Sequence, residues 1–145
     1  MLTTGLRRAE VAGLRWTDVD LGAGVISVQS TRVVVDFEVV VSEPKTAKGR
    51  RSVALDRLTV QALRAHQKAQ LSERLRAGPL WQDSGFVLVR EDGVPYHPER
   101  ITMMFKRNVA QAGLPAIRLH DLRHTAATLA LAAGVHPKIV QERLG

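Results

Sequence analysis

The stretch His-Asp-Leu-Arg-His at 120–124 constrains the fold more than any other part of the chain. On a helix over about 119–133, His120, Arg123 and His124 share one face, because residues three and four apart are neighbours on a helix. The other face is apolar and is expected to be buried; it carries Leu122, Ala126, Leu129, Ala130 and Ala133. The sequence therefore predicts a helix that is anchored in a core and presents two imidazoles and a guanidinium outward.

A guanidinium between two imidazoles is suited to an oxyanion. Arg123 can bind two phosphate oxygens in a fork, and a neighbouring imidazole can donate a hydrogen bond or move a proton near neutral pH. Ordinary helix-surface polarity is the competing interpretation. The spacing of His120 and His124 also occurs in zinc-binding helices, but Arg123 would repel a cation and no third ligand is evident. We therefore expect neither a metal nor a cofactor.

The charge balance predicts a polyanionic partner. The 145 residues include 21 Lys and Arg against 14 Asp and Glu, a net charge of +7, and nucleic acid is the first candidate. Aromatic residues make up only 4%, too few for a surface that stacks single-stranded bases, so duplex phosphates fit better. Cysteine is absent, which excludes disulfides and thiolate metal sites. No long apolar run or signal-peptide pattern occurs, so a cytoplasmic protein without a membrane partner is expected.

The N-terminal segment places a charged pair within an apolar stripe. Thr4 is the expected N-cap of a helix over about 5–16. On that helix Arg7 and Glu10 share a stripe with Val11 and Leu14. An inward charge is costly unless it is paired, so Glu10 is expected to hold Arg7 while leaving part of its fork available. A purely structural ion pair is the alternative.

Three β-rich segments, 25–30, 31–41 and 52–55, are expected to form a small antiparallel sheet. The connection before the last of them is a basic turn that contains Lys45, Lys48, Arg50 and Arg51. Basic loops are usually just solvated. A lysine on a hairpin can nevertheless reach a phosphate and protonate an alkoxide leaving group.

The remaining segments are predominantly helical. Asp56 is expected to cap a helix that ends at Gly78-Pro79, a second helix runs from Pro98 to about Ala112, and the last runs from Lys138 to Leu144. The buried stripe of the first of these helices is expected to be Val60, Leu63, Leu71 and Leu75. The predicted class is α+β, mainly helical, with a small three-stranded sheet.

Five motifs in order resemble the catalytic domain of the tyrosine recombinases, the phage-integrase family. They are Thr-Gly-Leu-Arg-Arg-Ala-Glu at 4–10, Leu-Arg-Trp-Thr-Asp-Val-Asp at 14–20, Pro-Lys-Thr-Ala-Lys-Gly-Arg-Arg at 44–51, His-Asp-Leu-Arg-His-Thr at 120–125 and Glu-Arg-Leu-Gly at 142–145. The order and spacing agree over nearly the whole chain. The resemblance implies a partner in duplex DNA and, for the full-length family, a homo-oligomeric assembly in a tetrameric synapse.

The resemblance also implies catalytic roles. Arg7 and Arg123 would stabilise the charge that develops on the non-bridging oxygens when a tyrosine attacks the scissile phosphate. Lys45 would protonate the leaving 5′ oxygen, with Lys48 as the alternative lysine. His120 would assist proton transfer or bind the phosphate.

Other residues are expected to support this set. Glu10 would hold Arg7, and His124 is expected to stand behind the catalytic groups. The basic turn would contact DNA through Lys48, Arg50 and Arg51.

The sequence departs from the family pattern at both ends. In the family a His or Trp and then the nucleophilic tyrosine follow the Leu-Gly, whereas this sequence ends at Gly145. Tyr96, the only tyrosine, precedes the His-x-x-Arg motif and lies in a predicted turn. We therefore expect 1–145 to be a partial catalytic domain that lacks the N-terminal DNA-clamping domain and the nucleophile, and that does not cleave DNA alone.

Two functions compete at this point. One is site-specific recombination or integration through a 3′-phosphotyrosine, and the other is a non-catalytic duplex-DNA-binding module, for example a helix-turn-helix formed by the last helices. A type IB topoisomerase would share the chemistry, but the hairpin and the motif at 120–125 look more like integrases. The recombinase would be favoured if four side chains converged on one site, because a protein that only binds DNA does not need such convergence. These are Arg7, Lys45, His120 and Arg123.

Overall fold

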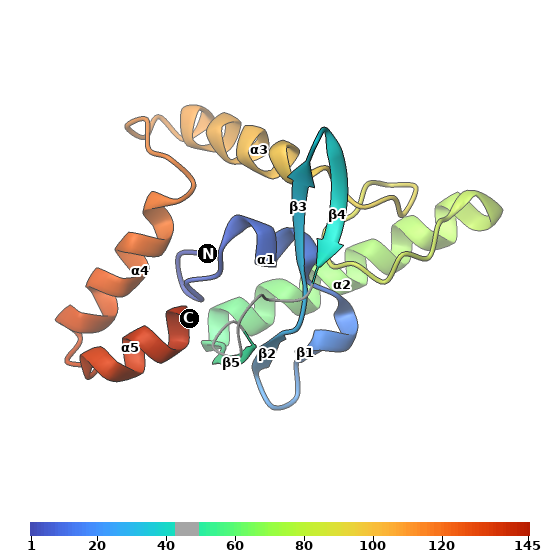
Figure 1. The fold of residues 1–145 in the computed structure, drawn as a ribbon. Coiled ribbons are helices and arrows are strands. Elements are labelled where there is room, and N and C mark those ends of the chain that lie inside the picture. The colour runs from blue at the N-terminus through green and yellow to red at the C-terminus, as the bar shows by residue number, and fades with distance from the viewer. Residues whose placement is uncertain (43–49) are drawn as a thin grey trace.

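A computed structural model describes residues 1–42 and 50–145 of the chain. The predicted lysines Lys45 and Lys48 lie outside the described residues. Helices are α1 (Arg8–Gly13), α2 (Arg57–Ala77), α3 (Pro98–Gln111), α4 (Asp121–Ala132) and α5 (Pro137–Leu144), with short 3-10 helices η1 (Trp16–Asp18) and η3 (Gly78–Leu80). Strands are β1 (Val19–Asp20), β2 (Val25–Val28), β3 (Thr31–Val35), β4 (Glu38–Ser42) and β5 (Arg51–Ala54). This confirms the predicted α+β class (Figure 1).

The strands form a three-stranded antiparallel sheet and a separate hairpin. The sheet has the order β1-β2-β5, with Ile26 opposite Val53, and the hairpin pairs β3 with β4. The expected single strand over 31–41 is wrong, because Asp36 and Phe37 form a two-residue turn in which both φ angles are positive. The third strand of the sheet is β1, which lies outside the three β-rich segments expected from the sequence.

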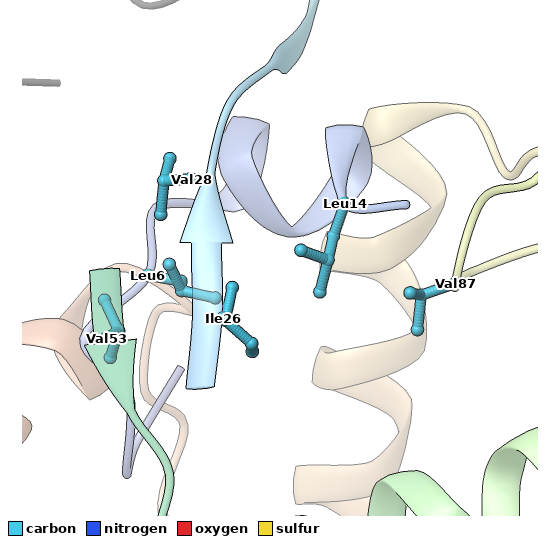
Figure 2. Packing of buried hydrophobic residues seen from close by; sticks show 6 residues of the cluster. All are labelled: Leu6, Leu14, Ile26, Val28, Val53 and Val87. Atoms are coloured by element: carbon cyan, nitrogen blue, oxygen red, sulfur yellow. The ribbon is translucent and has the colours of Figure 1, made fainter. Parts of the chain in front are cut away.

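The core lies where β2 and β5 face the N-terminal segment (Figure 2). Its members are Leu6, Leu14, Ile26, Val28, Val53 and Val87. Leu6 precedes α1 and Leu14 follows it, so both ends of this short helix are fixed against the sheet. Because Arg7 is adjacent to the buried Leu6, the core also fixes the backbone from which the Arg7 side chain leaves.

Helix α1 is shorter than expected, and its N-cap is Arg7 rather than Thr4. The Arg7 N–H donates to the Glu10 carboxylate at 2.7 Å, so the side chain at the third helical position satisfies the start of the helix. At the other end, Leu14 is extended, and its carbonyl accepts from the Val87 N–H at 2.9 Å. The segment before the helix approaches α5, because Nη2 of Arg143 donates to the Thr3 carbonyl.

Helix α2 has the predicted ends but a different buried face. Asp56 accepts from the Thr59 N–H at 2.8 Å, and the helix stops at Ala77, directly before Gly78. The expected stripe is right at Leu63, which packs against the core, and wrong at Leu71 and Leu75, which are 54% and 83% exposed. Gln70 is buried instead, since it donates to the Val87 carbonyl and accepts from the Trp16 indole. The distal half of α2 projects from the body of the molecule (Figure 1).

Helix α4 is anchored at its ends rather than buried along one face. The expected buried face is only half-buried at Leu122, Ala126 and Ala130, and Leu129 on the same face is 57% exposed. The helix contacts α5, which in turn lies against β5. Among the helices of 1–42 and 50–145, none combines the length and apolarity needed to span a membrane.

Candidate phosphate-binding site

Three arginines from three different elements meet at the C-terminal end of α5. Nε of Arg51 donates to the carbonyl of Arg143 (2.7 Å), Nη2 of Arg123 to that of Leu144 (2.8 Å) and Nη2 of Arg7 to that of Gly145 (2.5 Å). The last carbonyls of a helix have no partner within the helix, and they form the negative end of its dipole. The end of α5 therefore gathers guanidiniums from the N-terminal segment, β5 and α4.

A buried carboxylate balances part of this positive charge. The Glu10 side chain is 3% exposed. Its Oε1 accepts from Nη1 of Arg7 (3.0 Å) and Nη1 of Arg51 (2.9 Å), while Oε2 accepts from Nη2 of Arg51 (2.9 Å). Burial raises the pKa of Glu10, but the hydrogen bonds from Arg51 and the Arg7 backbone and the two positive charges outweigh it, so the pKa is lowered overall. The carboxylate thus stays ionised between two cations.

Arg7 and Arg123 lie close enough to share one oxygen. Nη2 of Arg7 and Nη2 of Arg123 both donate to the Gly145 carbonyl, at 2.5 and 3.3 Å. Burial and then the charge of Arg7 lower the pKa of Arg123. The Arg7 side chain is 45% exposed, so an anion in solvent can reach this pair. An oxygen held by two guanidiniums is the arrangement that a phosphate oxygen requires.

The predicted His120 is not brought to this oxygen. Its exposed ring packs edge-on against the His124 ring, with 4.8 Å between centroids. Among the described residues, the ring makes no hydrogen bond to Arg7 or Arg123. Helix α4 begins at Asp121, because the Asp121 carboxylate accepts from the Arg118 N–H at 2.9 Å. His120 is the N-cap residue, its backbone φ and ψ are helical, and its ring meets that of His124 one turn later, so the two imidazoles share a face as predicted.

His120 instead lines a separate cavity of about 430 Å³ that it shares with basic residues. The walls include Arg8, Lys106 and Arg118. In the part of the chain that the structure describes, no three His, Asp or Glu side chains cluster in a way that could hold a metal.

The position of Arg51 differs from the one predicted for the basic turn. It was expected to face DNA, but its side chain is 6% exposed and packs on Glu10. The missed signal is the alternation of β5, because Arg51 and Val53 lie two residues apart on one face of the strand and Val53 is fully buried. Arg50, one residue earlier, is exposed.

Tyr96 lies before α3, where its carbonyl accepts from Arg32.

Comparison with known proteins identifies the family. The model of the phage integrase family matches residues 1–145. The chain belongs to the phage integrase family. Its relatives include the tyrosine recombinase XerC-like protein of Caldanaerobacter subterraneus, 30% identical over 98% of this chain and 39% of that protein. The integrase of Mycobacterium phage L5 is 32% identical over 98% of this chain and 37% of its own length.

Solved structures of integrases and recombinases have the same fold. The Tn1549 transposon integrase, in complex with transposon right end DNA, matches with a TM-score of 0.82 and 26% identity, over 99% of this chain and 47% of that one. XerA recombinase matches with a TM-score of 0.78 and 26% identity, over 99% of this chain and 46% of that one. This phage integrase family chain therefore spans about two fifths of the length of the two curated relatives.

Proposed function

We propose that this chain is the phosphate-binding part of a tyrosine-recombinase catalytic domain, which acts on duplex DNA in site-specific recombination or integration. The observation that carries the proposal is the closeness of the Arg7 and Arg123 guanidiniums, which both donate to the main-chain oxygen of Gly145. A module that only binds DNA has no need for two arginines, more than a hundred residues apart in sequence, to converge. Membership of the phage integrase family supports the same reaction class.

The chemistry assigned to the pair is charge stabilisation. When a tyrosine attacks a phosphodiester in line, negative charge builds up on the non-bridging oxygens, and two rigid guanidiniums can stabilise it. Glu10 holds Arg7 through Nη1 and leaves Nη2 directed at the shared oxygen. Lys45, or Lys48, is proposed to protonate the leaving oxygen. His120 is proposed to assist from the start of α4.

Binding of a duplex oligonucleotide, followed by fluorescence anisotropy over a range of salt concentrations, tests the proposal. Arg123→Met should lower affinity roughly tenfold and reduce the slope of log K against log salt by about one phosphate contact. Arg123→Lys keeps the charge but loses the fork, so it should recover only part of the affinity. Circular dichroism would check that both variants fold.

The matched control is Arg90→Met, which removes an exposed arginine that pairs with Asp92. It lowers the net charge by the same amount but lies in a different part of the fold. If Arg90→Met and Arg123→Met weakened binding equally, a general charge effect would account for DNA binding and the proposed site would be wrong.

A further inference from the structure

We propose that Arg51 is a positioning residue: it orients Glu10, which in turn orients the Arg7 guanidinium toward the DNA phosphate. Arg51 itself does not contact DNA. The inference rests on the proposed function of the Arg7 and Arg123 pair and adds a residue to it. Sequence reasoning placed Arg51 among the DNA-contacting residues of the basic turn, and the two roles lead to different measurements.

The first step of the argument is how tightly Arg51 is held. Both terminal nitrogens donate to Glu10, one to each carboxylate oxygen, at 2.9 Å. The remaining nitrogen, Nε, donates to the Arg143 carbonyl of α5 at 2.7 Å. A guanidinium and a carboxylate joined by two parallel hydrogen bonds have one mutual orientation. Arg51 therefore fixes the plane of the Glu10 carboxylate relative to both β5 and α5.

The second step is how Glu10 passes this orientation to Arg7. Each carboxylate oxygen is shared, because Oε1 also accepts from Nη1 of Arg7 and Oε2 also accepts from the Arg7 backbone N–H. Arg7 is thus limited to one side-chain bond with Glu10, and its Nη2 points to the shared oxygen at Gly145. Without Arg51, the carboxylate could rotate and take both terminal nitrogens of Arg7, which would draw them away from a phosphate.

The third step is charge. Arg7, Arg51 and Glu10 together carry one net positive charge. Loss of Arg51 would leave Arg7 fully neutralised by Glu10, so the attraction for a phosphate would fall although the lost side chain is 6% exposed. Both the geometry and the charge of Arg7 therefore depend on Arg51.

The test is a double-mutant cycle on duplex-DNA binding by the whole 145-residue chain. The salt slope of binding is measured for Arg7→Met, Arg51→Met and the double variant. Each single change should reduce the slope by about one phosphate contact, and the double variant should show no further reduction. The matched control is Arg143→Met, which removes an arginine that bonds the Thr3 and Ala54 carbonyls and not Glu10. The control should keep the wild-type slope.

The outcomes separate the alternatives. The inference would be overturned if Arg51→Met left the salt slope unchanged. It would also be overturned if the double variant lost about two phosphate contacts, because Arg51 would then bind DNA directly. If Arg7→Met itself left the slope unchanged, the proposed function would fail instead. Should Arg51→Met not fold, Glu10→Gln is compared with Glu10→Gln/Arg51→Met, which leaves no buried carboxylate unpaired. These two should bind DNA equally, and weaker binding by the double variant would overturn the inference.

Discussion

Glu10 is an ionised side chain in the interior, held by Arg7 and Arg51, so its protonation is coupled to folding. Its pKa in the folded chain lies below the ordinary value of 4.5. A carboxyl of this kind stabilises the fold above its unfolded pKa, and the contribution is lost as the pH falls through the lower folded value. Acid should therefore destabilise the chain partly through this one residue.

We predict that Glu10→Gln lowers the free energy of unfolding at neutral pH by about 3 kcal/mol, because it leaves two arginines without a buried counter-charge. The variant should also lose less stability than the wild type as the pH falls below 4.5. Urea unfolding followed by circular dichroism at several pH values measures both effects.

The control for this prediction is Glu91→Gln, a change at an exposed glutamate. It should alter the unfolding free energy by less than about 0.5 kcal/mol. A Glu10→Gln variant with the wild-type pH dependence would show that Glu10 does not carry the expected linkage.

How much of the site could be predicted differs from residue to residue. The pairing of Arg7 with Glu10 follows from their spacing of three, and the motifs indicated Arg123. The inward position of Arg51 was missed, because the segment was interpreted as a turn although the strand alternation continues to Val53. The shared face of His120 and His124 follows from their spacing of four, but that spacing does not say how far the His120 ring lies from Arg7 and Arg123.

At the scale of elements, α1 and β3 approach each other through Gly13. A Cβ at this position would lie 2.9 Å from the Ser30 carbonyl oxygen and from Thr31 backbone atoms. Backbone atoms cannot move aside as a flexible side chain can, so the contact requires a residue without a side chain. This approach also brings the Ser30 hydroxyl to the Gly13 carbonyl, at 2.8 Å.

We predict that Gly13→Ala destabilises the chain by about 2 kcal/mol, through overpacking against the start of β3. Gly22→Ala is the comparison, because its Cβ would meet only the Asp20 carboxylate, at 3.3 Å. Thermal unfolding of the two variants measures the difference. Equal melting temperatures would mean that α1 and β3 can separate without cost.

Sequence patterns predicted most helix ends, because caps such as Asp56 and Gly78 act locally. They did not separate β3 from β4, since the turn at Asp36 and Phe37 lacks the Asn-Gly pair typical of two-residue hairpins. The buried face of α2 was right at Leu63 but wrong at Leu71 and Leu75. Gln70 is buried because two partners distant in sequence satisfy its amide: the Trp16 indole donates to it, and the Val87 carbonyl accepts from it.

At the scale of the whole molecule, burial is unevenly distributed. The core gathers around β2, β5 and the ends of α1, whereas α4 lies at the margin of the molecule (Figure 1). Leucines of α4 such as Leu129 are exposed. Segments with few buried apolar contacts open with a smaller free energy than the core does. The predicted amphipathic helix at 119–133 was right as a helix, but its apolar face has no buried residue to hold it.

We predict that backbone amides of α4 exchange with deuterium before those of β2 and β5. Hydrogen exchange followed by mass spectrometry of peptides over Asp121–Ala132, Val25–Val28 and Arg51–Ala54 would show this order. Equal protection of all three segments would indicate a single cooperative unit and contradict the prediction.

The carbonyl end of α5 has a consequence for the rate of any reaction at this site. Like charges repel, so a catalyst that had to assemble two guanidiniums during each turnover would meet that repulsion in its barrier. Here the helix end and Glu10 hold Arg7 and Arg123 together already in the folded ground state. The work of bringing the cations together is done when the chain folds, so little reorganisation is left for the proposed step in which charge moves onto phosphorus-bound oxygens.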